Sequence, residues 1–205
     1  MKKKDKIILY IFIFIFIINS LLILTKQIDS LDNLVLSFMI GIRSDNLTKI
    51  MINITNIGSA YALIVISILL LCLIKNKKIS LKIIINLIIV FIISQLLKLF
   101  FHRPRPDTIF LVNISDYSYP SGHTMISVAY FGYLLFLLYK YTNSKLIKII
   151  LTITTITLLT VISISRIYLG VHYLSDIIGG LSLGIIYLIL FINISNKKKV
   201  KEWKK

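Results

Sequence analysis

Long runs of apolar residues, separated by short polar segments, recur along the whole chain. Most runs approach the roughly 20 residues that an α-helix needs to cross about 30 Å of hydrocarbon, and lysines at their ends can extend the effective length. Because a backbone in lipid must satisfy its own hydrogen bonds, repeated runs favour an all-α helical bundle. The pattern predicts six transmembrane helices, at approximately residues 7–24, 57–74, 81–98, 123–139, 147–165 and 175–194.

The segment between the first two predicted spans, residues 25–56, has a different pattern. Apolar residues recur there at helical spacing, with polar and charged residues between them, in stretches that begin near Leu31 and Leu47. Ser44 precedes the second stretch and can cap it. This predicts one or two amphipathic helices on the outer membrane surface. Two roles stay open for them: packing on the bundle, or forming a lid that guides a lipid head group.

Composition and charge support a single polytopic membrane domain over residues 1–205, because 57% of the residues are hydrophobic and the mean hydropathy is +0.89. The net charge of +16 is concentrated in segments that would share one side of a six-span bundle, at 1–6, 75–82, 140–148 and 195–205. This positive-inside pattern predicts cytoplasmic termini, with 197–205 as a basic cytoplasmic tail. No nucleic-acid motif accompanies the charge, so we expect no nucleic-acid partner.

Three short motifs, far apart in the sequence, fall on one predicted face of the membrane. They read K-x6-R-P at 98–106, P-S-G-H at 120–123 and S-R-x5-H-x3-D at 165–176. Each motif adjoins the outer end of a predicted span. Hydropathy and charge alone predict this topology, so the convergence of the motifs is an independent indication that they form one site.

The first group of motif residues suits phosphate binding. Ser121 and Gly122 follow a proline and can form a sharp turn into a helix, whose free N–H groups attract anions. Lys98, Arg105 and Arg166 would neutralise phosphate charge, the arginines by bidentate contact. Phosphoryl transfer depends mostly on positioning and charge stabilisation, so such a cationic site is a candidate for that chemistry.

A histidine–carboxylate pair supplies the candidate nucleophile. His172 and Asp176 are four residues apart and would share a helix face, so the carboxylate can fix the imidazole tautomer and leave the other nitrogen free to attack phosphorus. His123, at the start of a different helix, is the candidate general acid. Outside the motif spacing, Arg103 is a candidate head-group contact, and Asp116 is expected to be a loop residue without a catalytic role.

The motifs resemble those of the type 2 phosphatidic acid phosphatase family, which they match without a gap, and the similarity extends from about Tyr61 to Ile194. The resemblance implies a phosphatase that needs no metal or other cofactor and forms a phosphohistidine at His172, with His123 as acid and Asp176 as the orienting carboxylate. The sequence shows no acidic cluster suited to Mg²⁺ or Zn²⁺, which agrees. The phosphate-binding residues that the resemblance implies are Lys98, Arg105, Ser121, Gly122 and Arg166.

We therefore expect an integral membrane lipid phosphatase that acts at the outer face of the cytoplasmic membrane. The family makes undecaprenyl diphosphate the first choice of substrate, with phosphatidylglycerophosphate or phosphatidic acid as alternatives. A phosphotransferase would share the first half-reaction and differ only in what attacks the phosphohistidine. A non-catalytic binder of lipid phosphates is a further alternative, although the presence of both histidines favours catalysis and the spans carry little internal charge.

Overall fold

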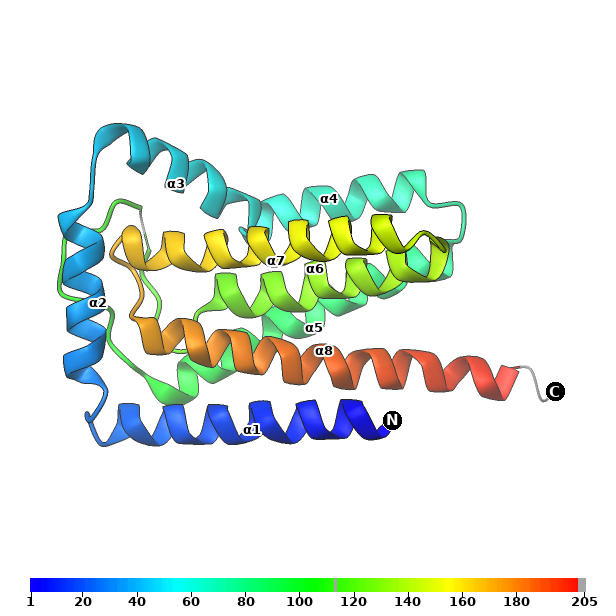
Figure 1. The fold of residues 1–205 in the computed structure, drawn as a ribbon, viewed down its shortest axis with the longest axis horizontal. Helices are drawn as coiled ribbons and strands as arrows, with labels where there is room; N and C mark the ends of the chain where they lie inside the picture. The colour runs from blue at the N-terminus through cyan, green and yellow to red at the C-terminus, as the bar shows by residue number, and fades with distance from the viewer. Residues whose placement is uncertain (113, 203–205) are drawn as a thin grey trace.

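Every regular element of the described chain is an α-helix, as the apolar runs predict (Figure 1). The computed structural model describes the backbone of residues 1–112 and 114–202 and the side chains of 1–112 and 114–196. Within these residues there is no strand, and the all-α class is confirmed. The helices are α1 (Lys3–Leu24), α2 (Asp29–Gly41), α3 (Asp45–Ile57), α4 (Ala60–Leu73), α5 (Lys77–Phe101), α6 (Gly122–Tyr141), α7 (Lys145–Tyr168) and α8 (Leu174–Glu202).

Five of these helices, α1, α5, α6, α7 and α8, are long and apolar enough to cross a membrane. α4 has 14 residues, or about 21 Å at 1.5 Å per residue, which is shorter than the hydrocarbon core. α3 and α4 together meet the criterion as a pair bent by 49° and give a sixth candidate span. At the bend, a Cβ on Gly58 would lie 2.8 Å from Ile162 Cγ2, so this glycine lets the chain pass close to α7.

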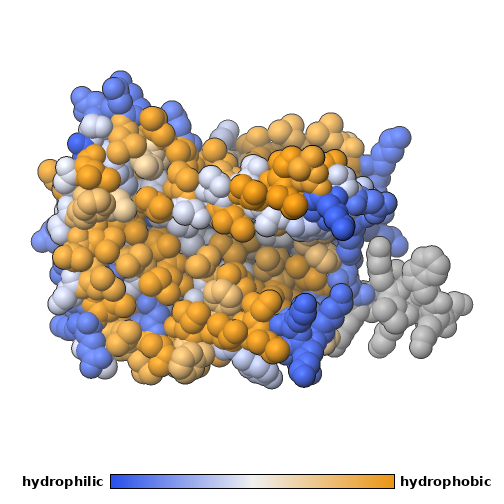
Figure 2. Space-filling model, viewed as in Figure 1, coloured by the Kyte–Doolittle hydropathy of each residue, from blue (hydrophilic) through white to orange (hydrophobic). Residues whose placement is uncertain are grey.

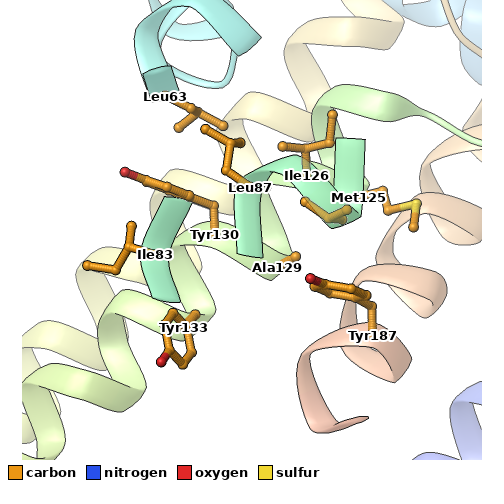
Figure 3. Packing of buried hydrophobic residues seen from close by; sticks show 10 residues of the cluster. Leu63, Ile83, Leu87, Met125, Ile126, Ala129, Tyr130, Tyr133 and Tyr187 are labelled. Atoms are coloured by element: carbon orange, nitrogen blue, oxygen red, sulfur yellow. The ribbon is translucent and has the colours of Figure 1, made fainter. Parts of the chain in front are cut away.

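α6 lies at the centre of the bundle and packs against α5, α7 and α8, while α1 packs on α8 and α4 on α5. The main apolar core fills the space between α4, α5, α6 and α8 (Figure 3). Its labelled members are Leu63, Ile83, Leu87, Met125, Ile126, Ala129, Tyr130, Tyr133 and Tyr187. These residues come from the predicted spans, which shows how the apolar runs provide both a core and a lipid-facing surface.

Two glycines one turn apart let α8 approach α6 closely. A Cβ on Gly180 would lie 2.6 Å from the backbone oxygen of Ser121, and a Cβ on Gly184 would lie 2.8 Å from Val128 Cβ. Small residues at such contacts are common between membrane helices because they let the backbones pack together. The approach brings the N-terminal ends of α6 and α8 together, and Ser121 N donates a hydrogen bond to the backbone oxygen of Asp176 at 3.0 Å.

The side of the bundle is apolar where it faces outward. Figure 2 shows a mainly hydrophobic flank, with hydrophilic residues gathered towards the two ends of the molecule. On α1, for example, Tyr10, Phe14 and Leu21 are exposed. An apolar surface of this extent is stable against lipid and would be unfavourable in water.

Residues 25–56, predicted as outer interfacial helices, form α2 and most of α3. α2 lies crosswise over one end of the bundle (Figure 1) and exposes Leu31, Leu34 and Phe38, as an interfacial helix requires. Its Asp32 points inward and is 1% exposed, which the sequence pattern did not predict. α3 packs against α7. Of the two roles that the sequence left open, α3 therefore has the first, packing on the bundle.

Both ends of the described chain lie at the end of the bundle opposite α2 (Figure 1). This arrangement is the one that a six-span topology requires. The predicted basic tail, 197–205, lies outside the described side chains, although the backbone of α8 continues to Glu202. The assignment of the two ends to the two sides of the membrane stays a prediction from the charge distribution.

Candidate active site

The three motifs converge at the end of the bundle that α2 covers. They come from the last turn of α5, the first turn of α6, the last turn of α7 and the first turn of α8, and the loop 102–121 crosses this end (Figure 1). Backbone hydrogen bonds hold the loop in place, from Leu111 N to the oxygen of Leu169 at 3.2 Å and from Ser118 N to the oxygen of Arg103 at 2.9 Å. The convergence predicted from topology is therefore present in the fold.

The His172–Asp176 pair is formed at the centre of the site. His172 lies in the turn just before α8 and is 1% exposed, and Asp176 lies in the first turn of α8 and is fully buried. His172 Nδ1 is 3.2 Å from Asp176 Oδ2, which also accepts a hydrogen bond from Tyr173 N at 2.9 Å. With the proton on Nδ1, Nε2 carries the lone pair, and this nitrogen is 3.3 Å from Arg105 Nη1.

The surroundings of His172 favour the neutral form of its imidazole. Burial, reinforced by the charges of Arg105, Arg166 and Lys98, holds the pKa of His172 well below its ordinary value of 6.5. A neutral imidazole with a fixed tautomer is the form that can act as a nucleophile towards phosphorus.

Lys98 and Arg105 are bridged by a carboxylate from the loop. Lys98 Nζ is 2.5 Å from Asp116 Oδ2, and Arg105 binds the other carboxylate oxygen through Nη2 and the backbone oxygen of Asp116 through Nε, at 2.7 Å. Burial opposes ionisation of Asp116, but the hydrogen bonds and charges of Lys98 and Arg105 outweigh it and lower its pKa. The two carboxylate oxygens therefore make the contacts that two oxygens of a phosphate group would make.

The start of α6 lies beside Lys98. Ser121 is the N-cap and Gly122 the first helical residue, one position earlier than the sequence pattern indicated. A Cβ on Gly122 would lie 3.2 Å from Ser94 Oγ, which is tighter than an ordinary contact, and 3.6 Å from Lys98 Cε, so the helix start lies close to α5 and to the lysine. First-turn N–H groups have no acceptor within the helix and can bind an anion. His123 follows on the same turn, partly exposed and within electrostatic range of His172 and the cations.

Arg166 is 2% exposed and only partly hydrogen bonded. Its Nη1 donates to Thr55 Oγ1 of α3 at 2.8 Å, while Nε and Nη2 have no partner among the described residues. Buried guanidinium N–H groups without acceptors are unfavourable, and an anionic ligand would supply the missing acceptors. The site therefore gathers all the residues predicted for it, and Arg166 retains unused binding capacity.

Sequence reasoning missed several contacts of the site. Asp116 was expected to be a loop residue without a catalytic role; it does lie in the loop, but its carboxylate between two of the cations was not predicted. Arg103, considered as a head-group contact, is paired with Asp176 and with Asp32 of α2. The repeated Arg-Pro step could have marked Arg103, whereas Asp32 and Thr55 lie far from the motifs in sequence and nothing in the pattern marks them.

The site has more basic side chains (Lys98, Arg103, Arg105 and Arg166) than carboxylates (Asp32, Asp116 and Asp176), so its net charge is positive, which suits an anion. In the part of the chain that the structure describes, no group of three or more His, Cys, Asp or Glu residues is placed to hold a metal ion. The expectation of metal-independent chemistry is a prediction that an assay must test.

Fold and site together define a helical membrane protein with a cationic, histidine-containing site at one end of the bundle. A family model described as the PAP2 superfamily matches residues 79–199, more than half of the chain, and the protein belongs to this family. The resemblance inferred from the three motifs is therefore confirmed, and the protein is a multi-pass membrane protein of a lipid phosphatase family.

Named relatives agree with this assignment. The chain is 30% identical over 194 residues to phosphatidylglycerophosphatase B of Bacillus subtilis (strain 168), covering 90% of this chain and 93% of that protein. It is 28% identical over 162 residues to an undecaprenyl-diphosphatase of Sulfolobus acidocaldarius, covering 76% and 74%. A solved PAP2 type phosphatidylglycerolphosphate phosphatase from Bacillus subtilis matches with a TM-score of 0.83 and 26% identity, over 92% of this chain and 96% of that one.

Proposed function

We propose that this protein removes the terminal phosphate of a membrane lipid without a metal ion, through a phosphohistidine at His172. The observation that carries the proposal is the position of His172 Nε2, which faces Arg105 in a buried site with Lys98 and Arg166 nearby. The unpaired nitrogens of Arg166 support it, because they lack the acceptors that a phosphate would provide.

In the first half-reaction, the substrate phosphate displaces Asp116 from Lys98 and Arg105. Nε2 of His172 attacks phosphorus, the bond between phosphorus and the leaving oxygen breaks, and that oxygen takes a proton from His123. The three cations and the start of α6 at Ser121 and Gly122 stabilise the charge on the transferring group.

In the second half-reaction, water attacks the phosphohistidine. His123 accepts the proton of the water, the P–N bond breaks with its electron pair returning to Nε2, and inorganic phosphate is released. Asp176 keeps its hydrogen bond to Nδ1–H of His172 in both steps, which stabilises the positive charge of the phosphorylated ring.

An apolar groove beside the site is proposed to hold the lipid tail. The groove lies between α6, α7 and α8, has a volume of about 480 Å³, and is lined by residues that include Val128, Leu135 and Leu188. Ile164 and Ile177, which also line it, are close in sequence to Arg166 and Asp176, so one end of the groove adjoins the site. We expect long-chain substrates to bind more tightly than short-chain analogues, because only a long chain can fill the groove and contact its lining.

Two substrates are candidates. The relative that matches 90% of the chain carries the name of a phosphatidylglycerophosphatase, which places phosphatidylglycerophosphate first in the assay. Undecaprenyl diphosphate, the substrate favoured by the sequence analysis, is supported by the relative named undecaprenyl-diphosphatase. The proposed orientation has the site at the outer face and the termini in the cytoplasm, supported by the basic segments and by the common position of the termini.

The test is phosphate release by detergent-purified protein in EDTA, with phosphatidylglycerophosphate, undecaprenyl diphosphate and phosphatidic acid in parallel. His172→Ala should abolish release. His102→Asn is the matched control, because His102 is exposed and has a left-handed backbone (φ 47°) that asparagine tolerates. Substantial release by His172→Ala would exclude the nucleophile assignment.

Three further conditions separate the alternatives. Loss of activity in EDTA that Mg²⁺ restores would exclude a metal-independent mechanism. Inhibition by vanadate is expected, because it adopts the five-coordinate geometry of the transferring phosphorus. Transfer of phosphate to an added lipid or sugar acceptor, in place of release, would favour a phosphotransferase.

A further inference from the structure

A buried network of charges connects the His172–Asp176 pair to α2, outside the three motifs. Arg103 Nη1 donates to Asp176 Oδ1 at 2.7 Å, and Arg103 Nη2 donates to Asp32 Oδ2 at 2.8 Å. The side chains of Arg103, Asp32 and Asp176 are 10%, 1% and 0% exposed. The guanidinium therefore lies between two carboxylates that have almost no access to water.

Ser175 completes this network. Its backbone N donates to Asp32 Oδ1 at 2.9 Å, and its hydroxyl accepts from Arg103 Nη1 at 2.7 Å and donates to Asp32 Oδ2. Ser175 lies in the first turn of α8, where a backbone N–H has no acceptor within the helix. Asp32 thus caps α8 from a different helix and fixes both the guanidinium of Arg103 and the start of the helix that carries Asp176.

The network leaves the carboxylate of Asp176 little freedom to rotate. Oδ1 is bound by Arg103, and Oδ2 accepts from His172 Nδ1 and Tyr173 N. Rotation of the carboxylate would break a charge-assisted hydrogen bond at each oxygen. The Tyr173 ring also lies 4.5 Å from the guanidinium carbon of Arg103, which restricts the arginine from the other side.

A role in stability alone does not account for this arrangement. Buried ion pairs are on average no more stabilising than apolar residues of the same volume, because desolvation of the charges opposes their attraction. The network does, however, fix the orientation of the Asp176 carboxylate, which contacts His172. Since a displacement of a reacting group by about 1 Å can lower the rate by about two orders of magnitude, such fixation has a direct kinetic consequence.

We propose that Asp32 and Arg103 are positioning residues that hold Asp176, and through it His172, in the orientation needed for attack on phosphorus. The proposal rests on the proposed function of the site. Neither residue contacts the reacting atoms. It assigns a role in catalysis to α2, which carries none of the motif residues.

Kinetics of the full-length protein test the proposal. Asp32→Asn and Arg103→Ala should each lower kcat about 10- to 100-fold with little change in KM. Because part of the effect of Asp32 passes through Arg103, the double variant should lose less than the two single losses combined. Arg103→Lys should recover part of kcat, since it restores the charge without the planar fork.

Asp29→Asn is the matched control. Asp29 lies one turn earlier on α2 and makes no ion pair among the described residues. Its variant should retain wild-type kcat. Equal kcat in Asp32→Asn and Asp29→Asn, additive losses in the double variant, or a change confined to KM would each overturn the proposal.

A second measurement does not depend on turnover. The chain has three histidines, so ¹⁵N-histidine labelling gives few NMR signals, and His172→Gln identifies that of His172. The wild type should show His172 protonated on Nδ1, and Asp32→Asn should show a mixture of tautomers. If Asp32→Asn does not fold, Ser175→Ala, which removes two hydrogen bonds and no charge, serves in its place.

The outcomes distinguish a failure of the proposed function from a failure of the positioning role. Wild-type protein that releases no phosphate from any lipid defeats the proposed function, while the tautomer measurement still tests the positioning role. Active wild-type protein whose kcat and His172 tautomer are unchanged in the variants defeats the positioning role alone.

Discussion

Replacement of Asp116 by asparagine removes a negative charge from between Lys98 and Arg105 and keeps the volume of the side chain. The Asp116 side chain is 39% exposed, whereas those of Lys98 and Arg105 are each 6% exposed. Because water screens the carboxylate, each pair is worth about 0.5–1 kcal/mol, as in exposed ion pairs, and the two together about 1–2 kcal/mol. A substrate phosphate must displace the Asp116 carboxylate, and so offset the free energy of these two ion pairs, to bind Lys98 and Arg105.

Asp116→Asn should therefore lower KM, and the inhibition constant of inorganic phosphate, by about 5- to 30-fold. The value of kcat should change little, because the carboxylate has left the cations before His172 attacks. Since Lys98 and Arg105 lower the pKa of Asp116, its carboxylate stays ionised near neutral pH, and the difference in KM should not change with pH there.

The assay is steady-state phosphate release over a range of substrate concentrations, with inorganic phosphate as a competitive inhibitor. Asp107→Asn is the control, because Asp107 is an exposed carboxylate of the same loop and its variant has the same net charge. An unchanged or higher KM in Asp116→Asn would refute the reasoning. It would mean that Asp116 organises the two cations for phosphate and does not compete with it.

Three other changes have defined outcomes. Because the pKa of His172 is held well below 6.5, the nucleophile stays neutral as pH falls, so the acidic limb of kcat/KM, corrected for substrate ionisation, should have its midpoint below pH 6.5; an acidic midpoint at or above 6.5 contradicts this. Arg166→Lys should weaken inorganic phosphate binding about 10- to 100-fold, measured by calorimetry, because the planar fork is lost; wild-type affinity would exclude the contact. Gly180→Ala should lower the free energy of unfolding by about 1–3 kcal/mol in thermal unfolding, because its Cβ would lie 2.6 Å from the backbone oxygen of Ser121. Gly41→Ala is the control and should be neutral, because a Cβ there has nothing within 4 Å; equal stabilities of the two variants would contradict the close approach of α8 to α6.

The membrane spans and the motif residues could be predicted from the chain alone because both are encoded locally. A span needs a run of apolar residues of a length fixed by the bilayer, and this is visible without knowing any partner. His172 and Asp176 meet because they are four residues apart across the start of α8. The order of the spans then places the ends of α5 and α7 and the starts of α6 and α8 on one face.

The bend between α3 and α4 could not be predicted in this way. The second apolar run is 57–74, but the helix within it has 14 residues, and Gly58 lies where the chain passes against Ile162 of α7. That contact exists only once α3 and α7 have packed. The pattern of α3 is amphipathic, so from sequence it fitted the membrane surface as well as the side of the bundle.

The partners of the site residues also depended on the complete fold. Asp32, Thr55 and Asp116 lie on α2, on α3 and in the loop 102–121, and their periodicity or composition is that of surface residues. α2 presents apolar side chains outward to lipid, which turns Asp32 inward onto Arg103. A buried charge needs a partner, but any of several acidic residues could have provided it. The packing of helices far apart in sequence determines which acidic residue pairs with Arg103, because only the assembled bundle brings the two side chains within hydrogen-bond distance.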